Sequence, residues 1–259
     1  MLRVETGRLL LPLAAATGFL LLWQLAVAAS GTRIFPPPTE VARGLAELFA
    51  TGVLGPYIWD SLRRVSGGYL AAVASGVPLG MLLGRFPIFG EALNPLVQML
   101  RPISPLAWMP LAVIWFGIGD MAPVFLIFMG ALFPILLATM QGVRNIPAMY
   151  LQAAENFGLS ELATLRRVIF PAILPRVITG LRIALGVAWV VLVASEMIAV
   201  DSGLGYLIID ARNAGKRYDL VVGGMLLIGS IGLVLDIMVR RLEQLAVVRW
   251  ALSDNRSKP

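Results

Sequence analysis

Long apolar stretches recur along this chain and limit what it can fold into. A helix needs about 20 mainly apolar residues to cross the hydrocarbon core of a bilayer. Six stretches approach or exceed that length, and they cover residues 9–29, 61–83, 100–116, 122–140, 177–200 and 220–239. The pattern therefore predicts an all-α, polytopic membrane protein with about six transmembrane helices.

The composition supports this class and narrows the chemistry. The chain is 58% hydrophobic and 14% charged, with a mean hydropathy of +0.84, which is more apolar than a soluble domain can hide. It contains neither cysteine nor histidine. Their absence excludes disulfides and thiolate sites, and it removes the commonest metal ligand and general base. We therefore expect no catalytic residue and no metal site.

Two of the apolar stretches allow a second interpretation. The first follows Arg3 and Arg8 and holds Ala26, Val27 and Ala28 near its end, so it also resembles a cleaved signal peptide. Its length and the spans that follow favour a retained helix. The third stretch contains Pro102, Pro105 and Pro110, which break any simple helix, so the sequence does not fix the residues at which this span begins and ends.

The basic residues predict an orientation rather than a nucleic-acid partner. The net charge is +6, and arginines flank the apolar stretches, as is typical of membrane topology signals. A cytoplasmic N-terminus and C-terminus would place Arg63 and Arg64 outside. The larger group of basic residues would then lie on the cytoplasmic side, including Arg166, Arg167, Arg240, Arg241, Arg249, Arg256 and Lys258.

A polar segment, QAAENFGLSELATLRRVIFP over residues 152–171, interrupts the apolar pattern. Asn145 is placed to cap a first helix, and Gly158 suits the left-handed residue that ends it. Ser160 is placed to cap a second helix that we expect to end before Pro171. The segment predicts a helix–turn–helix outside the bilayer, in which the small side chains of Ala153 and Ala154 let another protein approach closely. The alternative is a solvated helical loop.

The spacing of this segment resembles the cytoplasmic EAA loop of ABC importer permeases. Alanines, a glycine and a proline fall at the family's positions, whereas Gln152 replaces the usual glutamate, and Val168 and Phe170 replace Ile and Leu. In that family the loop is a coupling helix that docks on an ATP-hydrolysing subunit. The resemblance assigns ATPase coupling to residues 142–176, and above all to Gln152, Ala153, Ala154, Glu155, Phe157, Gly158, Leu159 and Ser160.

Two further stretches narrow the resemblance. RPISPLAWMPLAVIWFGIGD, residues 101–120, and SGLGYLIIDARNAGKRYDLVV, residues 202–222, are similar to segments of permeases of the nitrate, sulfonate, taurine and bicarbonate group. The resemblance implies a single permease domain over residues 1–259, with its core at 61–245 and the type I ABC importer permease fold. It also implies a bacterial inner (plasma) membrane protein that moves a small anion by alternating access.

The resemblance further implies a set of partners. Two ABC ATPase subunits would bind the ATP and Mg, because this chain lacks a P-loop: its Gly215-Lys216 is followed by Arg217 rather than Ser or Thr. A second copy of the permease, most simply as a homodimer, a periplasmic or lipid-anchored binding protein, and membrane lipid would complete the assembly. We expect no cofactor on this chain and no nucleic acid. The alternative functions are an ion-gradient-driven secondary transporter or channel, and a membrane-embedded enzyme.

A few residues inside the spans are candidates for the pathway or for helix packing. Glu196 lies within an apolar span, where charge is expensive, so it is either a gate or helix-pairing residue or a hydrated residue near the outer surface. Arg101 is either an attractor for an oxyanion or an arginine at the cytoplasmic edge. Trp108 and Met109 either line the path or pack. The remaining candidates form a G-x-x-x-G-x-x-x-G pattern for close helix contact: Gly76, Gly80 and Gly84.

Overall fold

The computed structural model describes residues 2–31 and 35–243, and its regular elements there are all helices. They are α1 (Leu2–Ser30), α2 (Pro38–Ala50), α3 (Leu54–Arg85), α4 (Pro87–Leu100), the 3-10 turn η1 (Pro105–Trp108), α5 (Met109–Phe116), α6 (Met121–Arg144), α7 (Ala148–Asn156), α8 (Glu161–Thr164), the π-helical turn η2 (Leu165–Ile169), α9 (Phe170–Ala199), α10 (Leu204–Gly215) and α11 (Tyr218–Glu243).

The lengths of these helices confirm an all-α membrane protein. Within the described residues, four helices are long and apolar enough to cross a membrane, and a bent pair brings the number to as many as five. The four correspond to α3, α6, α9 with the turns before it, and α11. Each contains one of the apolar stretches expected from the sequence. The terminal Arg249, Arg256 and Lys258 lie outside the described residues.

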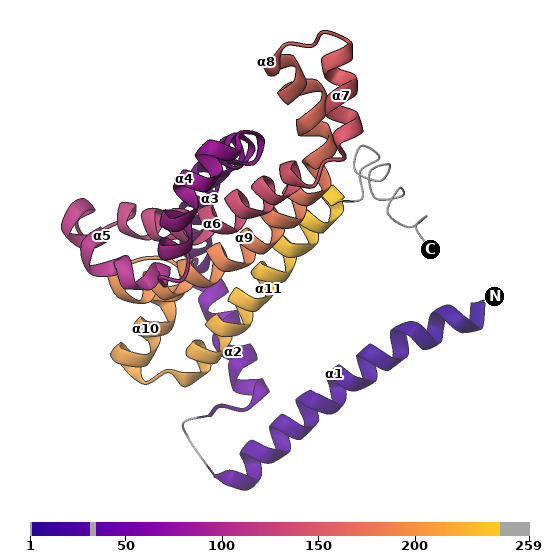
Figure 1. Ribbon diagram of the computed structural model, residues 1–259. Helices are drawn as coiled ribbons and strands as arrows, with labels where there is room; N and C mark the ends of the chain where they lie inside the picture. The colour runs from indigo at the N-terminus through magenta and orange to yellow at the C-terminus, as the bar shows by residue number, and fades with distance from the viewer. Residues whose placement is uncertain (1, 32–34, 244–259) are drawn as a thin grey trace.

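Helix α6 is the centre of the bundle, with α3 packed along one side and α9 along another (Figure 1). The core consists of buried aliphatic side chains from these helices, among them Leu126, Ile135 and Leu192. The helices α7 and α8 project from one end, which we call the hairpin end. Helix α10 lies at the opposite end, the α10 end (Figure 1).

The third predicted span is wrong in its bounds. The structure places a helix, α4, over residues 87–100, where we expected a loop, and it meets the η1–α5 segment at an angle of 83°. The bend lies at residues 101–104, where Pro102 and Pro105 prevent a continuous helix. The proline run that we placed inside a span therefore lies at the bend between two helices.

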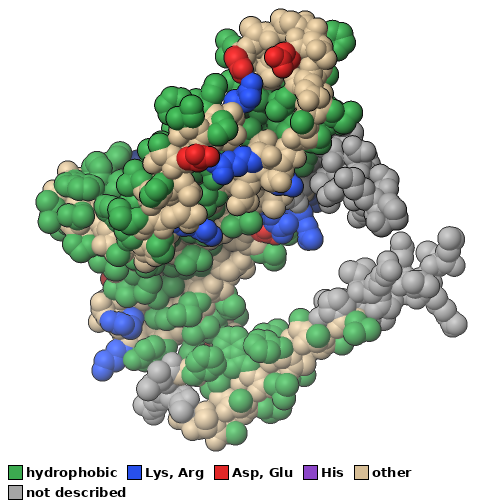
Figure 2. Space-filling model, in the orientation of Figure 1, with side chains coloured by type: hydrophobic (Ala, Val, Ile, Leu, Met, Phe, Trp, Pro, Cys, Tyr) green, Lys and Arg blue, Asp and Glu red, His purple; other side chains and the backbone are tan. Residues whose placement is uncertain are grey.

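The first predicted span lies within α1, but the apolar segment described there, Ala14–Ser30, is shorter than a membrane span, so α1 is not among the four. Figure 1 shows α1 apart from the bundle, beyond the loop that leads into α2. Trp23 forms a ring contact with Phe35 in that loop, with centroids 5.5 Å apart. Figure 2 shows hydrophobic side chains over much of the described part of α1.

The polar segment forms a hairpin whose second arm does not end at Pro171, contrary to our prediction. Residues 161–199 form one continuous helical rod, because the π turn η2 lets the Phe170 N–H bond to the Leu165 carbonyl. A π turn relaxes the tight backbone pattern that a proline would otherwise break. The second arm of the hairpin is therefore continuous with the membrane-spanning α9.

Candidate functional site

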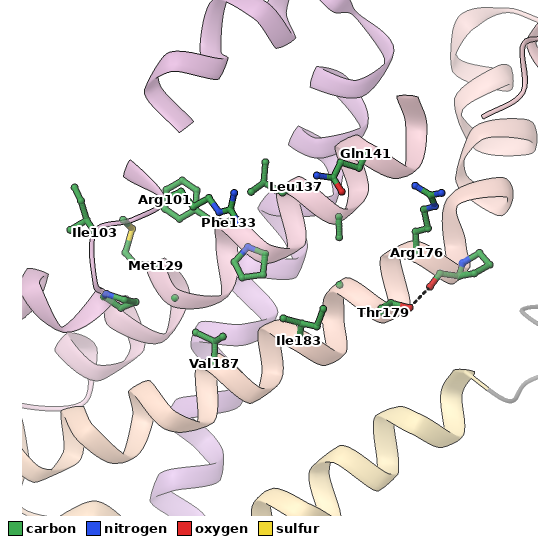
Figure 3. Close-up of a pocket in the computed structure, with 16 residues that line it drawn as sticks. Arg101, Ile103, Met129, Phe133, Leu137, Gln141, Arg176, Thr179, Ile183 and Val187 are labelled. Atoms are coloured by element: carbon green, nitrogen blue, oxygen red, sulfur yellow. Dashed lines mark hydrogen bonds between the residues drawn. The ribbon is translucent and has the colours of Figure 1, made fainter. Parts of the chain in front are cut away.

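A cavity of about 640 Å³ opens between α6, α9 and the bend that follows α4 (Figure 3). Its wall includes residues 129–141 of α6 and residues 175–187 of α9, which are the halves of these helices nearest the hairpin. Gly130 and Pro105 lie at its inner limit, and beyond them the helices pack into the core. The cavity therefore belongs to the hairpin half of the bundle.

Three long polar side chains project from a wall that is mainly apolar; the fourth polar residue, Thr179, bonds through its hydroxyl to the Pro175 carbonyl of its own helix. Arg101 extends from the bend, Gln141 lies near the end of α6, and Arg176 lies in the first turns of α9 (Figure 3). Within the described part of the chain, neither arginine forms an ion pair, although Arg63, Arg64, Arg85, Arg182 and Arg217 all do. Two unpaired guanidinium groups and an amide make this cavity suitable for a small anion.

Arg101 lies at the bend that follows α4 and on the cavity wall. Trp108 and Met109, the other candidates from this segment, are outside the cavity lining. Met109 is buried in the core and Trp108 packs against it.

The hairpin combines a capped turn with large apolar side chains that are exposed. Gly158 has a φ of 67°, the left-handed conformation that joins the two arms, and Ser160 Oγ accepts a bond from the Ala163 N–H at 3.4 Å. Ala154 is buried inside the hairpin, whereas Ala153 is exposed. Gln152, Glu155 and Ser160 are also exposed, Leu159 is half-buried, and the most exposed large side chains are Phe157 (84%), Leu162 (75%) and Met149 (67%).

Arg85 at the end of α3 braces this hairpin through a bidentate contact with Glu161, at 2.7 and 3.3 Å. Asn145, which we expected to cap α7, instead donates from Nδ2 to the Gln141 carbonyl at the end of α6. In Figure 2, charged side chains appear at and just below the hairpin, and hydrophobic side chains cover the face formed by α5.

The three glycines of α3 allow it to approach α6 closely. A Cβ at Gly76 would lie 3.0 Å from Ile135, and one at Gly80 would lie 2.7 Å from the Leu136 carbonyl. One at Gly84 would lie 2.6 Å from Val143. These distances leave no room for a side chain, so the pattern marks the α3–α6 contact.

Glu196 lies away from the cavity in a buried ionic cluster at the α10 end. Its side chain is 0% exposed, and it accepts from Arg64 NH1 at 2.8 Å and from Ser61 Oγ at 2.9 Å. Arg64, which we placed in an outer segment, is only 3% exposed and also contacts Asp120 at 2.7 Å. The hydrated position considered for Glu196 is therefore incorrect.

The sequence analysis missed the partners of Glu196. The available signal was Ser61 and Arg64 three residues apart, hence on one face of a helix, combined with a lone acid inside another span. Asp120 and Ser202 complete the cluster from two loops.

The comparison with known families decides the class of this protein. The family described as binding-protein-dependent transport system inner membrane component matches residues 76–247. The chain belongs to this family. The matched region holds the cavity, the hairpin and the rod that joins them.

The relatives of this permease are similar over most of their length. A putative ABC transporter permease protein of Methanocaldococcus jannaschii is 38% identical, covering 93% of this chain and 92% of the relative. The taurine transport system permease protein TauC of Escherichia coli is 36% identical, covering 81% and 78%. The nitrate import permease protein NrtB of Leptolyngbya laminosa is 36% identical, covering 91% and 87%.

The fold is similar to that of a solved ABC importer. A chain of the MetNI methionine ABC transporter in an inward facing conformation matches with a TM-score of 0.65 and 18% identity, covering 78% of this permease and 97% of that chain. A second crystal form matches with a TM-score of 0.57.

Proposed function

We propose that this permease imports a small anion and is driven by a separate ATPase that binds the hairpin. The observation that carries the proposal is the projecting hairpin, whose exposed apolar side chains are continuous with a rod that also forms the cavity wall. An exposed Phe157 in water is costly unless a partner covers it. A push on the hairpin would be transmitted along the rod to the cavity.

The cavity supports an anionic substrate. Its unpaired Arg101 and Arg176 favour negative charge, and Gln141 adds hydrogen-bonding capacity. Relatives carry the names of taurine, bicarbonate and nitrate transport systems. Nitrate, bicarbonate and sulfonates such as taurine all present oxyanion groups that guanidinium groups bind well. We infer that a receptor outside the cell selects among them and delivers the anion to this path.

The remaining parts of the assembly follow from this proposal. Two ATPase subunits bind ATP and Mg, and this chain neither binds nucleotide nor acts as an enzyme. Two permease copies, as a homodimer, enclose the path between them. The hairpin end and both termini face the cytoplasm of a bacterial inner membrane, and the α10 end faces outward. Gly215-Lys216-Arg217 then lies at the α10 end, on the side without ATP.

Two matched variants test the coupling role. Phe157 in the hairpin and Ile118 in the loop before α6 are both 84% exposed. The permease is co-expressed with its genomic neighbour ATPase and a receptor, and the complex is placed in nanodiscs. We expect Phe157→Asp, like Gly158→Trp, to abolish co-purification or receptor-stimulated ATP hydrolysis, and Ile118→Asp to retain both.

The proposal fails if the wild-type chain purifies without any ATPase, or if both aspartate variants behave alike. In the first case, transport driven by an ion gradient becomes the leading alternative. Receptors loaded with nitrate, taurine, an alkanesulfonate or bicarbonate, tested in parallel, identify the anion by which of them stimulates hydrolysis.

A further inference from the structure

Helix α10 begins without a cap of its own. Its first residue follows Gly203, which has a φ of 104° and no side chain to accept a hydrogen bond. The first amides are instead satisfied by other helices. The Leu204 N–H donates to Ser61 Oγ of α3, and the Gly205 N–H donates to Glu196 Oε2 of α9, both at 2.9 Å. A carboxylate at a helix N-terminus also opposes the helix dipole favourably.

This shared cap is sealed from solvent. Ser61 and Glu196 are both 0% exposed. Arg64 holds the preceding loop as well as the acid, because its guanidinium donates to the Ser202 carbonyl at 2.8 Å and to Ser202 Oγ at 2.6 Å. A Cβ at Gly203 would lie 2.7 Å from Arg64 NH1, so the loop fits closely around the ion pair. Buried charges of this kind persist only when their partners remain in place.

The two halves of the cap belong to helices with different attachments. Glu196 lies three residues from the end of the rod 161–199, whose other end is the hairpin. Ser61 and Arg64 belong to α3, which packs on α6 along its length. Any movement of the rod relative to α3 therefore changes the cap that holds α10. The cavity lies in the hairpin half in this structure, so α10 lies at the end away from it.

We propose that Glu196 is a positioning residue that links α10 to the movement of the coupling hairpin, so that α10 opens and closes the pathway at the end away from the cavity. The inference rests on the proposed function, because it requires an ATPase that moves the hairpin. It assigns to Glu196 a role through α10 rather than contact with the transported anion.

The test measures hydrogen exchange of the assembled complex, without nucleotide and with ATP trapped by vanadate. Glu196→Gln keeps the shape of the side chain but presents an amide donor toward Arg64. Asp236→Asn is the control. Asp236 of α11 pairs at 2.7 Å with Arg182, which lies in α9 like Glu196, so this ion pair joins α9 to α11 rather than to α10. In the wild type and in Asp236→Asn, we expect the amides of residues 204–208 to change protection between the two states.

In Glu196→Gln, the hairpin amides should still respond to nucleotide, whereas those of α10 should not. Uptake per ATP hydrolysed should fall roughly tenfold, within the range typical of coupling between two sites. A purely structural role would instead raise exchange equally in both states and leave that ratio unchanged. Arg64→Lys serves as a milder variant that keeps the charge but loses the planar fork, and it should show the same effect in part.

The possible failures are distinguishable. If no ATPase binds the wild type, the proposed function is wrong and this inference falls with it. If the ATPase binds and the hairpin responds, but α10 responds equally in wild type and Glu196→Gln, only this inference is overturned.

Discussion

Two groups of arginines in this bundle have opposite surroundings. Arg64, at the α10 end, is 3% exposed and bonds to Glu196, Asp120 and Ser202. Arg101 and Arg176, on the cavity wall, are exposed and form no ion pair among the described residues. The contrast separates two uses of the same side chain within one membrane protein. A guanidinium with all three nitrogens hydrogen-bonded inside the protein holds elements together, and one without such partners can bind a ligand.

Removing Arg64 is the most direct test of this contrast between buried and exposed arginines. Arg64→Ala leaves Glu196 buried without its cation, and loss of one partner of a buried pair costs about 3–5 kcal/mol. We expect a large fall in the midpoint of thermal unfolding in nanodiscs, together with a low yield. The measurement is the unfolding midpoint followed by intrinsic fluorescence.

Arg101→Ala is the matched control for this loss. Because Arg101 is exposed and unpaired in the described structure, its removal should change stability by no more than about 0.5 kcal/mol. Equal losses for the two variants would show that the distinction between sealed and open arginines is wrong.

The sealed cluster also depends on a glycine. Gly203 has a left-handed φ of 104° and lies against Arg64, so Gly203→Ala adds both backbone strain and a steric clash. We expect a destabilisation of about 1–3 kcal/mol. The same unfolding midpoint measures it, in the same lipid.

Gly186→Ala provides the comparison within α9. A Cβ there meets nothing within 4 Å, and replacing a glycine inside a helix by alanine is favourable by roughly 0.5–1 kcal/mol. An unfolding midpoint that falls in Gly186→Ala as far as in Gly203→Ala would contradict the assignment.

The open arginines should affect transport and leave stability unchanged. A hydrogen bond to a charged group contributes about 1.5–3 kcal/mol, so Arg101→Gln or Arg176→Gln should slow anion uptake roughly tenfold or more. Uptake into proteoliposomes, with saturating loaded receptor, measures the effect. The control is Arg241→Gln, an exposed arginine outside the cavity lining, which should leave uptake unchanged. Equal losses in all three would remove the cavity from the path.

Local features of the hairpin could be predicted from sequence because they depend on neighbours in the chain. Gly158 adopts the left-handed conformation and Ser160 caps α8, both as expected from residue type. The end of the second arm could not be predicted, because a π turn at residues 165–169 carries the helix through Pro171. Proline predicts a break only where the backbone keeps its ordinary α pattern.

The partners within the ionic cluster at the α10 end were not predicted, because the available sequence signal does not say which helices come together. Ser61 and Arg64 lie more than 130 residues from Glu196, and only the packing of α3, α9 and a loop brings them together. The position of Arg101 depends on where a proline-rich span begins and bends, which local pattern leaves open. Apolar periodicity located the helices that surround the cavity, and the tertiary fold decided which charges face it.

A third kind of arginine, paired but exposed, should give the smallest effect. Arg217 contacts Glu47 at 2.6 Å at the α10 end, and this hydrogen bond and charge hold the pKa of the Glu47 carboxyl below its usual value. Because the pKa of this carboxyl is lower in the folded state, the ion pair stabilises the protein at a pH above the ordinary glutamate pKa of about 4.3. That stability is lost as the pH falls through the pKa of the folded state. The unfolding midpoint of Glu47→Gln should therefore be slightly lower than wild type at neutral pH and converge with it in acid.

Glu40→Gln, on the same helix and without an ion pair in the described structure, should match wild type throughout. A deficit in Glu40→Gln at neutral pH that likewise disappears in acid would mean that exposure, rather than pairing, sets the acid response.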